Sequence, residues 1–404
     1  MEMPELRELL TPVGLGLIDE VGELATTDAV AAAVGRLRRA GHSPELVTAV
    51  VGQARLRTKA RGKFGALADR MLLTRAGLEQ ATRLEVAALH AARFRDAGVT
   101  RVADLGCGIG GDSLGFAGLG MRVLAVDADD VTAALAAYNL APYDAEVRCA
   151  RAEDVELDGV DGLWLDPARR TAGHGETRRV STSDYTPALD WAFATARRLP
   201  TGIKLGPAFE RGDIPADAEA QWIGVDGSTI ELVLWWGALA REGVRRAALV
   251  IRGGTAHELT AATDAEDAEV RQLGAFLHEP DGAVIRARLI GDVARALQAG
   301  MLDERIAYLT SDAPLTSPFV QSFRVREELP ADPAKLSKAL RARGIGRLEI
   351  KKRGVDVDPA ALRTRLKLAG DGAATLLLTR TAAGRRAILA DRVGASAAQP
   401  IQPA

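Results

Sequence analysis

The 404-residue sequence is poor in the residues that build metal centres and disulfide frameworks. It contains only two cysteines, Cys107 and Cys149, which excludes a disulfide scaffold and a four-cysteine zinc site. The five histidines show no HxxxH spacing and the chain has no CxxC pair, so we expect no structural metal. We expect Cys149 to lie in the core, because free cysteine is among the most buried residue types.

Long apolar runs are also missing. The longest candidate, residues 232–240, is well short of the ~18 apolar residues that a membrane-spanning helix needs. The N-terminus carries Glu2, Glu5 and Glu8, a charge opposite to that of a secretory signal. We therefore expect a cytoplasmic protein without a membrane partner.

What the sequence does have is enough apolar residues for several ordinary cores. Hydrophobic residues make up 47% of the chain and charged residues 26%, a composition that is not typical of disorder. At roughly 150 residues per domain, this length suggests two or three domains.

The charges are unevenly distributed, although the formal net charge is only −2. Residues 321–390 carry sixteen Lys or Arg and seven Asp or Glu, a net charge of +9. The rest of the chain is therefore about −11. This separation of positive and negative charge along the chain, rather than the net charge, indicates a binding partner.

Residues 1–95 show the apolar spacing of helices, with Ala, Leu and Arg recurring at intervals of ~3.6 residues. Within them, residues 55–75 contain a single acid, Asp69, and seven basic residues: Arg55, Arg57, Lys59, Arg61, Lys63, Arg70 and Arg75. Two interpretations remain open, a solvated helix face and a surface that contacts phosphates.

From about residue 99, short apolar runs alternate with helical stretches. This alternation is typical of a parallel α/β sheet, and we expect a doubly wound, Rossmann-like domain. The expected strands are residues 101–105, 121–126, 145–148, 162–165, 201–205, 231–236 and 246–251. The last two follow each other closely, so we expect them to form an antiparallel hairpin at the edge of the sheet.

After Gly253-Gly254 the pattern changes again. Residues 256–320 are weakly patterned, and we interpret them as a connector. From Phe323 the pattern predicts strand, helix, strand, helix and two strands, which makes a small basic α+β domain. Asp332-Pro333 and Asp358-Pro359 each look like a helix N-cap followed by proline at the first helical position.

A glycine-rich loop, Gly106-Cys-Gly-Ile-Gly-Gly111, follows the first strand of the α/β region. Glycines there let the backbone turn sharply and approach a ligand closely. Gly106, Gly108 and Gly111 also fit the GxGxxG fingerprint, so the loop alone leaves a dinucleotide site open.

Acidic residues favour S-adenosylmethionine over a dinucleotide. Asp104 stands two residues before the first glycine, where a dinucleotide fingerprint normally has an apolar residue. A buried carboxylate needs a cationic or hydrogen-bonding partner, and S-adenosylmethionine brings a sulfonium and an ammonium. Asp127 ends the second strand and can accept from ribose hydroxyls, whereas Asp154 follows the third strand and can accept from the adenine amino group. The carboxyl ends of parallel strands share one crevice.

The fourth strand ends in Asp166-Pro-Ala-Arg-Arg170. Proline cannot continue a central strand, so the chain turns outward at the carboxyl edge, beside the methyl donor. Asp166 can accept a hydrogen bond, or a proton, from an amino group that is being methylated. The alternative is a strand terminator with a solvated acid. Lys204, in the fifth strand, is a candidate substrate contact at the same edge.

These residues resemble a known family. Residues 99–255 resemble a class I S-adenosylmethionine-dependent methyltransferase, and residues 102–112 and 120–127 are similar to its trimethylguanosine synthase branch. The whole chain resembles bacterial methyltransferases with a helical N-terminal region and a C-terminal THUMP-like domain. Recognisable landmarks of that group are residues 166–170, Ser183-Asp-Tyr-Thr-Pro187 and Thr310-Ser-Asp312. THUMP domains are RNA-binding modules of RNA-modifying enzymes, which agrees with the positive charge of residues 321–390.

The resemblance implies a set of site residues. The expected contacts to the cofactor S-adenosyl-L-methionine are Asp104, Gly106, Cys107, Gly108, Gly110, Asp127, Ala128, Glu153, Asp154 and Asp166. The expected catalytic residue is Asp166, and the expected substrate contacts are Pro167, Arg169, Arg170 and Lys204. Amino-group methyltransferases usually have (Asp/Asn/Ser)-Pro-Pro-aromatic, and this chain departs from that pattern at Ala168 and Arg169. Arg169 can stack on a base by its guanidinium plane or hold a phosphate.

We therefore expect four regions: a helical N-terminal region (1–95), a methyltransferase domain (96–255), a connector (256–320) and a THUMP-like basic α+β domain (321–395). The expected function is methyl transfer from S-adenosylmethionine to a nucleophile on RNA, most simply a base amino group. Two alternatives stay open. One is a methyltransferase that acts on a protein or a small molecule, and the other is a non-catalytic RNA-binding protein that retains the cofactor pocket.

Overall fold

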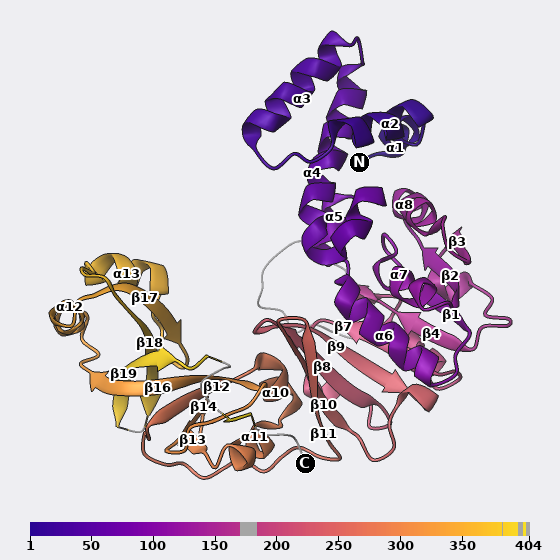
Figure 1. Ribbon diagram of the computed structural model, residues 1–404. Helices are drawn as coiled ribbons and strands as arrows, with labels where there is room; N and C mark the ends of the chain where they lie inside the picture. The colour runs from indigo at the N-terminus through magenta and orange to yellow at the C-terminus, as the bar shows by residue number, and fades with distance from the viewer. Residues whose placement is uncertain (170–183, 382, 395–398, 401–404) are drawn as a thin grey trace. The chain divides into compact units, whose positions relative to one another are not determined.

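The computed structural model describes residues 1–169, 184–381, 383–394 and 399–400 (Figure 1). The chain divides into two units. Unit 1 comprises Met1–Leu205, Pro215–Ala218 and Leu234–Ala240. Unit 2 comprises Gly206–Ile214, Glu219–Val233 and Arg241–Ala404.

Unit 1 begins with helices, as the spacing of apolar residues predicts. They are α1 (Met3–Leu9), α2 (Pro12–Val21), α3 (Thr27–Arg39), α4 (Pro44–Phe64), a 3₁₀ turn (Gly65–Arg70), α5 (Arg75–Gln80) and α6 (Leu84–Asp96). Local capping explains where several of them start. Thr26 and Ser43 each accept a hydrogen bond from the backbone N–H three residues on, which satisfies a donor that the first turn leaves unpaired.

The basic stretch 55–75 is used in part for packing. Arg57 is buried, with its guanidinium 2.8 Å from the Asp19 carboxylate. Arg61 pairs with two acidic residues, and Lys63 Nζ donates to three backbone carbonyls of residues 78–81 at 2.7–2.8 Å. These three side chains therefore support the helical region, which argues against a continuous phosphate-binding face there.

A parallel sheet follows in unit 1, and it confirms the α/β prediction. Its strands run in the order β3-β2-β1-β4-β7. Their bounds are β1 (Arg101–Leu105), β2 (Arg122–Asp127), β3 (Ala145–Cys149), β4 (Gly162–Leu165) and β7 (Thr201–Leu205). Every neighbouring pair in this order is parallel. Between the strands come α7 (Gly111–Gly118), α8 (Asp130–Leu140) and α9 (Leu189–Ala196), so the five expected strands are confirmed to within two residues.

An aromatic cluster packs against the middle of this sheet. Trp164 and Trp235 are buried with ring centroids 5.8 Å apart, and the His90 ring lies 4.4 Å from that of Trp164. A Cβ atom on Gly202 would come within 2.7 Å of both indole rings, so only glycine fits at this point of β7. Burial of such large apolar side chains is the main stabilising contribution, at about 25 cal/mol per Å² of apolar surface.

The remaining strands of this nine-stranded sheet correct one prediction. They are β8 (Glu219–Val225), β9 (Ser228–Trp236), β10 (Arg246–Arg252) and β11 (Thr255–Ala261), in the order β11-β10-β8-β9. The expected hairpin of residues 231–236 with 246–251 is wrong, because β10 pairs with β8 in parallel and with β11 antiparallel.

The reason is that β8 starts with polar residues that hide its apolar character. Glu219 and Gln221 are buried, and Glu219 Oε1 lies 2.6 Å from the Arg241 guanidinium. A local signal for β8 was present nonetheless. Asp226 and Gly227, both at positive φ, join β8 to β9, and Asp-Gly is a favoured two-residue hairpin turn.

Unit 2 also contains a seven-stranded sheet, in the order β13-β14-β12-β16-β19-β18-β17. Its strands are β12 (Phe276–Pro280), β13 (Gly300–Asp303), β14 (Ile306–Ser311), β16 (Val320–Leu329), β17 (Ile345–Lys352), β18 (Gly372–Thr381) and β19 (Gly384–Arg392). The helices are α10 (Gly282–Ala287), α11 (Ile290–Ala296), α12 (Pro333–Ala342) and α13 (Pro359–Leu366). Residues 256–320, interpreted from sequence as a connector, thus supply β12, β13 and β14, and β12 pairs directly with β16.

The two N-caps predicted in this region are confirmed. The Asp332 side chain accepts hydrogen bonds from the backbone N–H groups of Ala334 and Lys335, and that of Asp358 accepts one from Ala360. Proline occupies the start of both helices, where no N–H partner is required. Their inward leucines join a core with residues of β16 to β19.

Two short two-stranded sheets complete the described structure. One pairs β5 (Ala168–Arg169) with β6 (Tyr185–Thr186), and the other pairs β15 (Leu315–Thr316) with β20 (Gln399–Pro400). Within the described residues, no helix combines the length and the apolar character that crossing a membrane would require.

Candidate active site

Four of the predicted site residues lie at the carboxyl edge of the parallel sheet in unit 1. Asp104 is the last residue but one of β1, Asp127 ends β2, Asp166 directly follows β4 and Lys204 is near the end of β7. Because these strands are parallel and adjacent, their ends meet at one edge. The sequence prediction of a shared crevice is therefore supported by the strand order.

The glycine-rich loop is held against two of these strand ends. The backbone N–H groups of Gly106 and Cys107 both donate to the Val126 carbonyl of β2, at 2.8 and 2.9 Å. Gly106 has a φ of +91°, and a Cβ atom there would lie 2.7 Å from the carbonyl oxygen of Asp166. Only glycine suits both the conformation and the close approach.

Asp104 is a buried carboxyl that forms no ion pair with any of the described residues. Its side chain accepts a hydrogen bond from Ser113 Oγ at 2.5 Å through Oδ2. Its Oδ1 has no hydrogen-bond partner among the described residues, and the residue is only 1% exposed. Burial, together with the nearby Asp112 charge, raises the pKa of Asp104 to about 8. The carboxyl therefore suits a cation, such as the sulfonium and ammonium of S-adenosylmethionine.

Asp127 is half-buried and already organises the loop. Its carboxylate accepts backbone hydrogen bonds from Gly108 and from Asp129, each at 3.0 Å. Burial raises the pKa of Asp127, which these two hydrogen bonds partly offset. Each carboxylate oxygen can accept more than one hydrogen bond, so capacity remains for ribose hydroxyls.

The residues expected around the adenine are more exposed. Asp154 ends a 3₁₀ turn (Ala152–Asp154) after β3, with 69% of its side chain exposed, and Glu153 accepts a hydrogen bond from Arg151 at 3.0 Å. Ala128, after β2, is exposed too. Cys149 is exposed, so the prediction that it lies in the core is wrong, because β3 is the edge strand of the sheet.

Cys107 in the glycine-rich loop and Pro167 in the segment after β4 are both buried. Burial raises the pKa of the Cys107 thiol well above its usual value, which keeps the sulfur neutral and unsuited to nucleophilic attack. Pro167 directs the chain out of β4 into β5. Arg169 is exposed on β5, opposite Tyr185 of β6, whereas Arg170 lies outside the described residues. Sequence reasoning had not placed Tyr185 at the site.

A second group that sequence reasoning missed is centred on Asp112 of α7. Its buried carboxylate accepts hydrogen bonds from Thr82 Oγ1 at 2.7 Å and lies 2.9 Å from His90 Nδ1. Burial would raise the pKa of Asp112, but the charge of Lys204 and the hydrogen bond from His90 hold it well below its usual value. The one local signal was an acid placed directly after the glycines of the loop.

Lys204 connects this buried group to Asp166. Its Nζ lies 2.5 Å from Asp166 Oδ2, 2.9 Å from Thr82 Oγ1 and 3.5 Å from Asp112 Oδ2. Only 11% of the Lys204 side chain is exposed. Thr82, which precedes the glycine-rich loop, and Asp112, which follows it, thus contact the same ammonium group.

The loop is also tied to the N-terminal helical region through Asn139 of α8. Asn139 is buried and donates from Nδ2 to the carbonyls of Leu72 and Ile109, both at 3.0 Å. Its Oδ1 accepts from the Leu72 N–H at 2.8 Å. Ile109 belongs to the glycine-rich loop, so one amide spans the loop and the segment that packs on it.

We expect Asn139→Ala to lower the free energy of unfolding by about 2–4 kcal/mol, because it leaves buried backbone groups unsatisfied. It should also weaken S-adenosylmethionine binding about tenfold, because the Ile109 carbonyl is released. Gln53→Ala is the matched control, since the buried Gln53 bonds to Leu73 and, within the part of the chain that the structure describes, not to the loop. Urea denaturation and calorimetry measure the two effects. Equal losses of affinity in both variants would contradict a specific role for Asn139 in the loop.

A parallel sheet with a glycine-rich loop after β1 and acids at three strand ends is typical of α/β proteins that bind a nucleoside-containing cofactor. Comparison with known proteins narrows this class to one family. Two curated Mycobacterium tuberculosis proteins, from strains CDC 1551 and H37Rv, are described as uncharacterized S-adenosylmethionine-dependent methyltransferases. Each is 35% identical over 360 residues, which cover 86% of this chain and 96% of the relative. The chain belongs to the S-adenosylmethionine-dependent methyltransferases, an enzyme family whose cofactor is S-adenosylmethionine.

Further matches agree with this family. A family model described as THUMP domain-like matches residues 320–392, and one described as a domain of unknown function matches residues 2–60. A crystal structure from Porphyromonas gingivalis W83, provisionally described as a methyltransferase, has a TM-score of 0.70 at 20% identity. It covers 91% of this chain and 99% of that one, which shows a common fold. The predicted resemblance to a methyltransferase with a THUMP-like domain is confirmed.

Proposed function

We propose that this methyltransferase acts on RNA and that Asp166 orients a base amino group for methylation. The observation that carries the proposal is that the THUMP domain-like match, residues 320–392, coincides with the segment of +9 net charge. THUMP domains bind RNA in RNA-modifying enzymes, and phosphate neutralisation supplies most of the affinity for nucleic acids.

Helices α12 and α13 of unit 2 carry several exposed basic side chains. These two helices pack beside each other and bury Leu336, Leu340, Leu362 and Leu366. Their exposed residues include Lys335, Lys338, Arg341, Arg363 and Arg365. By contrast, Arg326, Arg386 and Arg392 on the strands pair with Asp391, Glu328 and Glu349. The helices therefore offer positive charge that is available to phosphates.

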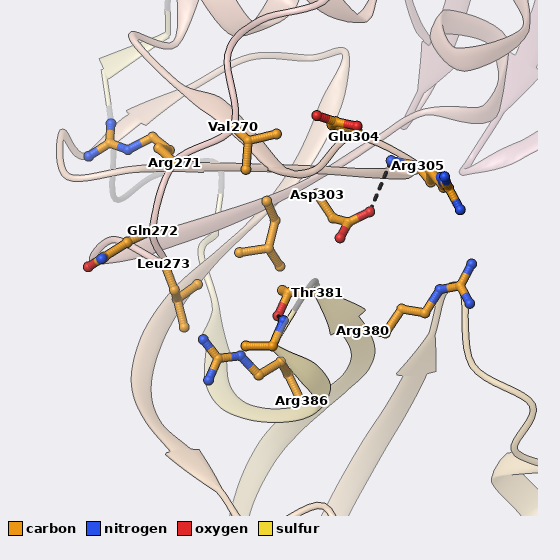
Figure 2. Close-up of a pocket in the computed structure, with 12 residues that line it drawn as sticks. Val270, Arg271, Gln272, Leu273, Asp303, Glu304, Arg305, Arg380, Thr381 and Arg386 are labelled. Carbon is orange, nitrogen blue, oxygen red and sulfur yellow. Dashed lines mark hydrogen bonds between the residues drawn. The ribbon is translucent and has the colours of Figure 1, made fainter.

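A hollow in the same unit is less suited to phosphates (Figure 2). It has a volume of about 660 Å³ and is lined by Arg271, Arg305, Arg380 and Arg386. Arg271 already pairs with Asp312 and Arg386 with Glu328, and the lining also contains two acids. Figure 2 shows one of them, Asp303, hydrogen-bonded to the backbone N–H of Arg305.

The site residues suggest how the chain prepares the reaction. We propose that Asp104 meets the positive charge of the cofactor, Asp127 its ribose and Asp154 its adenine. When bound, S-adenosylmethionine supplies a methyl group on a positively charged sulfur. Asp166, at the end of β4, accepts a hydrogen bond from the acceptor amine and so aims its lone pair, which makes catalysis mainly a matter of positioning.

The experiment that tests the proposal incubates the full chain with methyl-tritiated S-adenosylmethionine and total cellular RNA. We expect S-adenosylhomocysteine to form and label to enter RNA, and ribonuclease to remove that label. A parallel incubation with a protein extract should stay unlabelled. Label in protein, or turnover that needs no RNA, would overturn the RNA proposal and leave the methyltransferase assignment intact.

The role of α12 predicts a change in salt dependence. Lys335→Gln, Lys338→Gln and Arg341→Gln combined should weaken RNA binding and reduce the slope of log K against log salt by about 2, at ~0.7 per lost single-strand phosphate contact. The matched control replaces Arg326, Arg386 and Arg392 by Gln, an equal change of charge at residues that are already ion-paired. Filter binding of labelled total RNA at several salt concentrations measures both. Equal slopes for the two triple variants would contradict a phosphate-binding α12.

A further inference from the structure

The ammonium group of Lys204 is saturated by protein acceptors. An ammonium has three N–H donors, and Lys204 Nζ lies within 2.9 Å of Asp166 and Thr82 and 3.5 Å from Asp112. These three acceptors come from different parts of unit 1: the end of β4, the segment between α5 and α6, and the first turn of α7. A direct contact of Lys204 with substrate would have to break one of these interactions.

We propose that Lys204 is a positioning residue for methyl transfer, which holds Asp166 ionised and turned to the reacting edge. This inference rests on the proposed role of Asp166 in orienting the acceptor amine. The short Lys204–Asp166 contact favours the charged form of the carboxyl, because an adjacent cation lowers the pKa of an acid by ~1–3 units. It also restricts the rotation of Asp166, of whose side chain 34% is exposed.

Lys204 is in turn held in place by buried side chains. Thr82 Oγ1 donates to Asp112 Oδ2 at 2.7 Å and accepts from Lys204, so the hydroxyl bridges the two charged groups. His90 Nδ1 lies 2.9 Å from the other Asp112 oxygen, and its ring packs against Trp164 at a tilt of 34°. Trp164 belongs to β4 and stands two residues before Asp166, which directly follows that strand.

Lys204 should affect the rate of methyl transfer through its effect on Asp166. Protonation of Asp166 would remove its negative charge and turn one of its two acceptor oxygens into a donor, so activity should fall at acidic pH with the pKa of this carboxyl. Without Lys204 that pKa rises, and the acidic limb of the pH–rate profile moves to higher pH. Among the residues that the structure describes, the other titratable groups around the pair include Asp104 on β1, Cys107 in the loop, Asp112 on α7, His90 on α6 and Lys63 on α4.

The first arm of the test needs no substrate. Thermal unfolding of the full chain is measured for Lys204→Met, Asp166→Asn and the double variant. If the two side chains interact, the loss of Tm caused by Lys204→Met should be smaller by about 2 °C or more once Asp166 is already Asn. Additive losses would overturn the proposal, because the contact would then carry no energy.

The second arm measures methyl incorporation into total RNA between pH 5 and pH 9. Lys204→Met should move the acidic limb up by about one to three pH units, and should leave it unmoved when Asp166 is Asn. The matched control is Arg57→Met, which removes another buried, ion-paired cation of unit 1. It should lower Tm without moving the limb. A limb that stays in place in Lys204→Met, or moves equally in Arg57→Met, would overturn the positioning role.

The two arms separate this inference from the proposed function. If wild-type protein does not methylate RNA, the proposed function fails, and the Tm cycle still decides whether Lys204 and Asp166 are coupled. If RNA is methylated and the limb does not move, Asp166 can act without Lys204, and only the positioning role is lost.

Discussion

Asp166→Ala is expected to lower methyl transfer by ~10²-fold or more, the scale of a lost orienting or proton-accepting group. The affinity for S-adenosylmethionine should change by less than about 1 kcal/mol. The reason is position: Asp166 follows β4, whereas Asp104 and Asp127, proposed to hold the cofactor, close β1 and β2. An interaction that matters when the lone pair is aimed contributes to the transition state and not to cofactor binding. Single-turnover kinetics and calorimetry measure the two quantities.

Asp166→Asn refines this test, because its amide keeps an acceptor oxygen and cannot take a proton. Activity that is retained in Asn and lost in Ala would mean that Asp166 orients the amine. Loss in both variants would mean that a negative charge or a base is needed. Full activity in Ala would contradict the catalytic role and leave Asp166 as the terminator of β4, with Arg169 and Lys204 as the next candidates.

Asp104→Asn should have two effects of opposite sign. It should weaken S-adenosylmethionine binding by about 3 kcal/mol or more, because the cofactor then lacks its buried counter-charge. It should also stabilise the cofactor-free protein at neutral and alkaline pH. Asparagine retains an oxygen that can accept from Ser113 and needs no ionisation, whereas ionising the buried Asp104 is costly, as its pKa of about 8 shows.

The pH dependence of this stabilisation follows from the direction of the shift. The pKa of Asp104 in the folded chain, about 8, lies above its ordinary value of 3.8. The stability that the protonated carboxyl contributes is therefore fully present below about pH 4 and is lost as pH rises through 8. The advantage of Asp104→Asn should grow between these limits by at most about 1.4 kcal/mol per pH unit.

Urea denaturation at pH 5, 7 and 9 checks this expectation, with Asp158→Asn as the control, since Asp158 is an exposed acid of the same unit. The control should show no such trend. A difference between wild type and Asp104→Asn that is the same at all three pH values would mean that Asp104 is ionised before the cofactor binds.

Part of this structure follows from local features of the sequence. The strands β1, β2, β3, β4 and β7 were predicted because each is a short apolar run between helical stretches, and the N-caps Asp332 and Asp358 because the cap and its proline are adjacent. Asp104 was recognised as unusual because a carboxylate stands where an apolar residue is normal, and the structure places it in a buried site.

Other features depended on partners distant in the sequence. The expected hairpin was wrong because β8 lies next to β10, and the buried Glu219 of β8 becomes compatible with a strand only when Arg241 pairs with it. Residues 256–320 lacked a clear pattern, yet one of their strands, β12, is completed by hydrogen bonds to β14 and β16. Cys149 was placed in the core because its residue type favours burial, whereas its exposure depends on β3 lying at the edge of the sheet.

The candidate site divides in the same way. The sequence by itself determined which acids close the strands, because the side chain and the strand end are adjacent along the chain. Only the tertiary structure decided that Thr82, His90 and Asp112 surround Lys204, and that Lys204 contacts Asp166. The physical reason is that a buried charge is stable only with partners, and local sequence patterns do not specify which distant side chains will supply them.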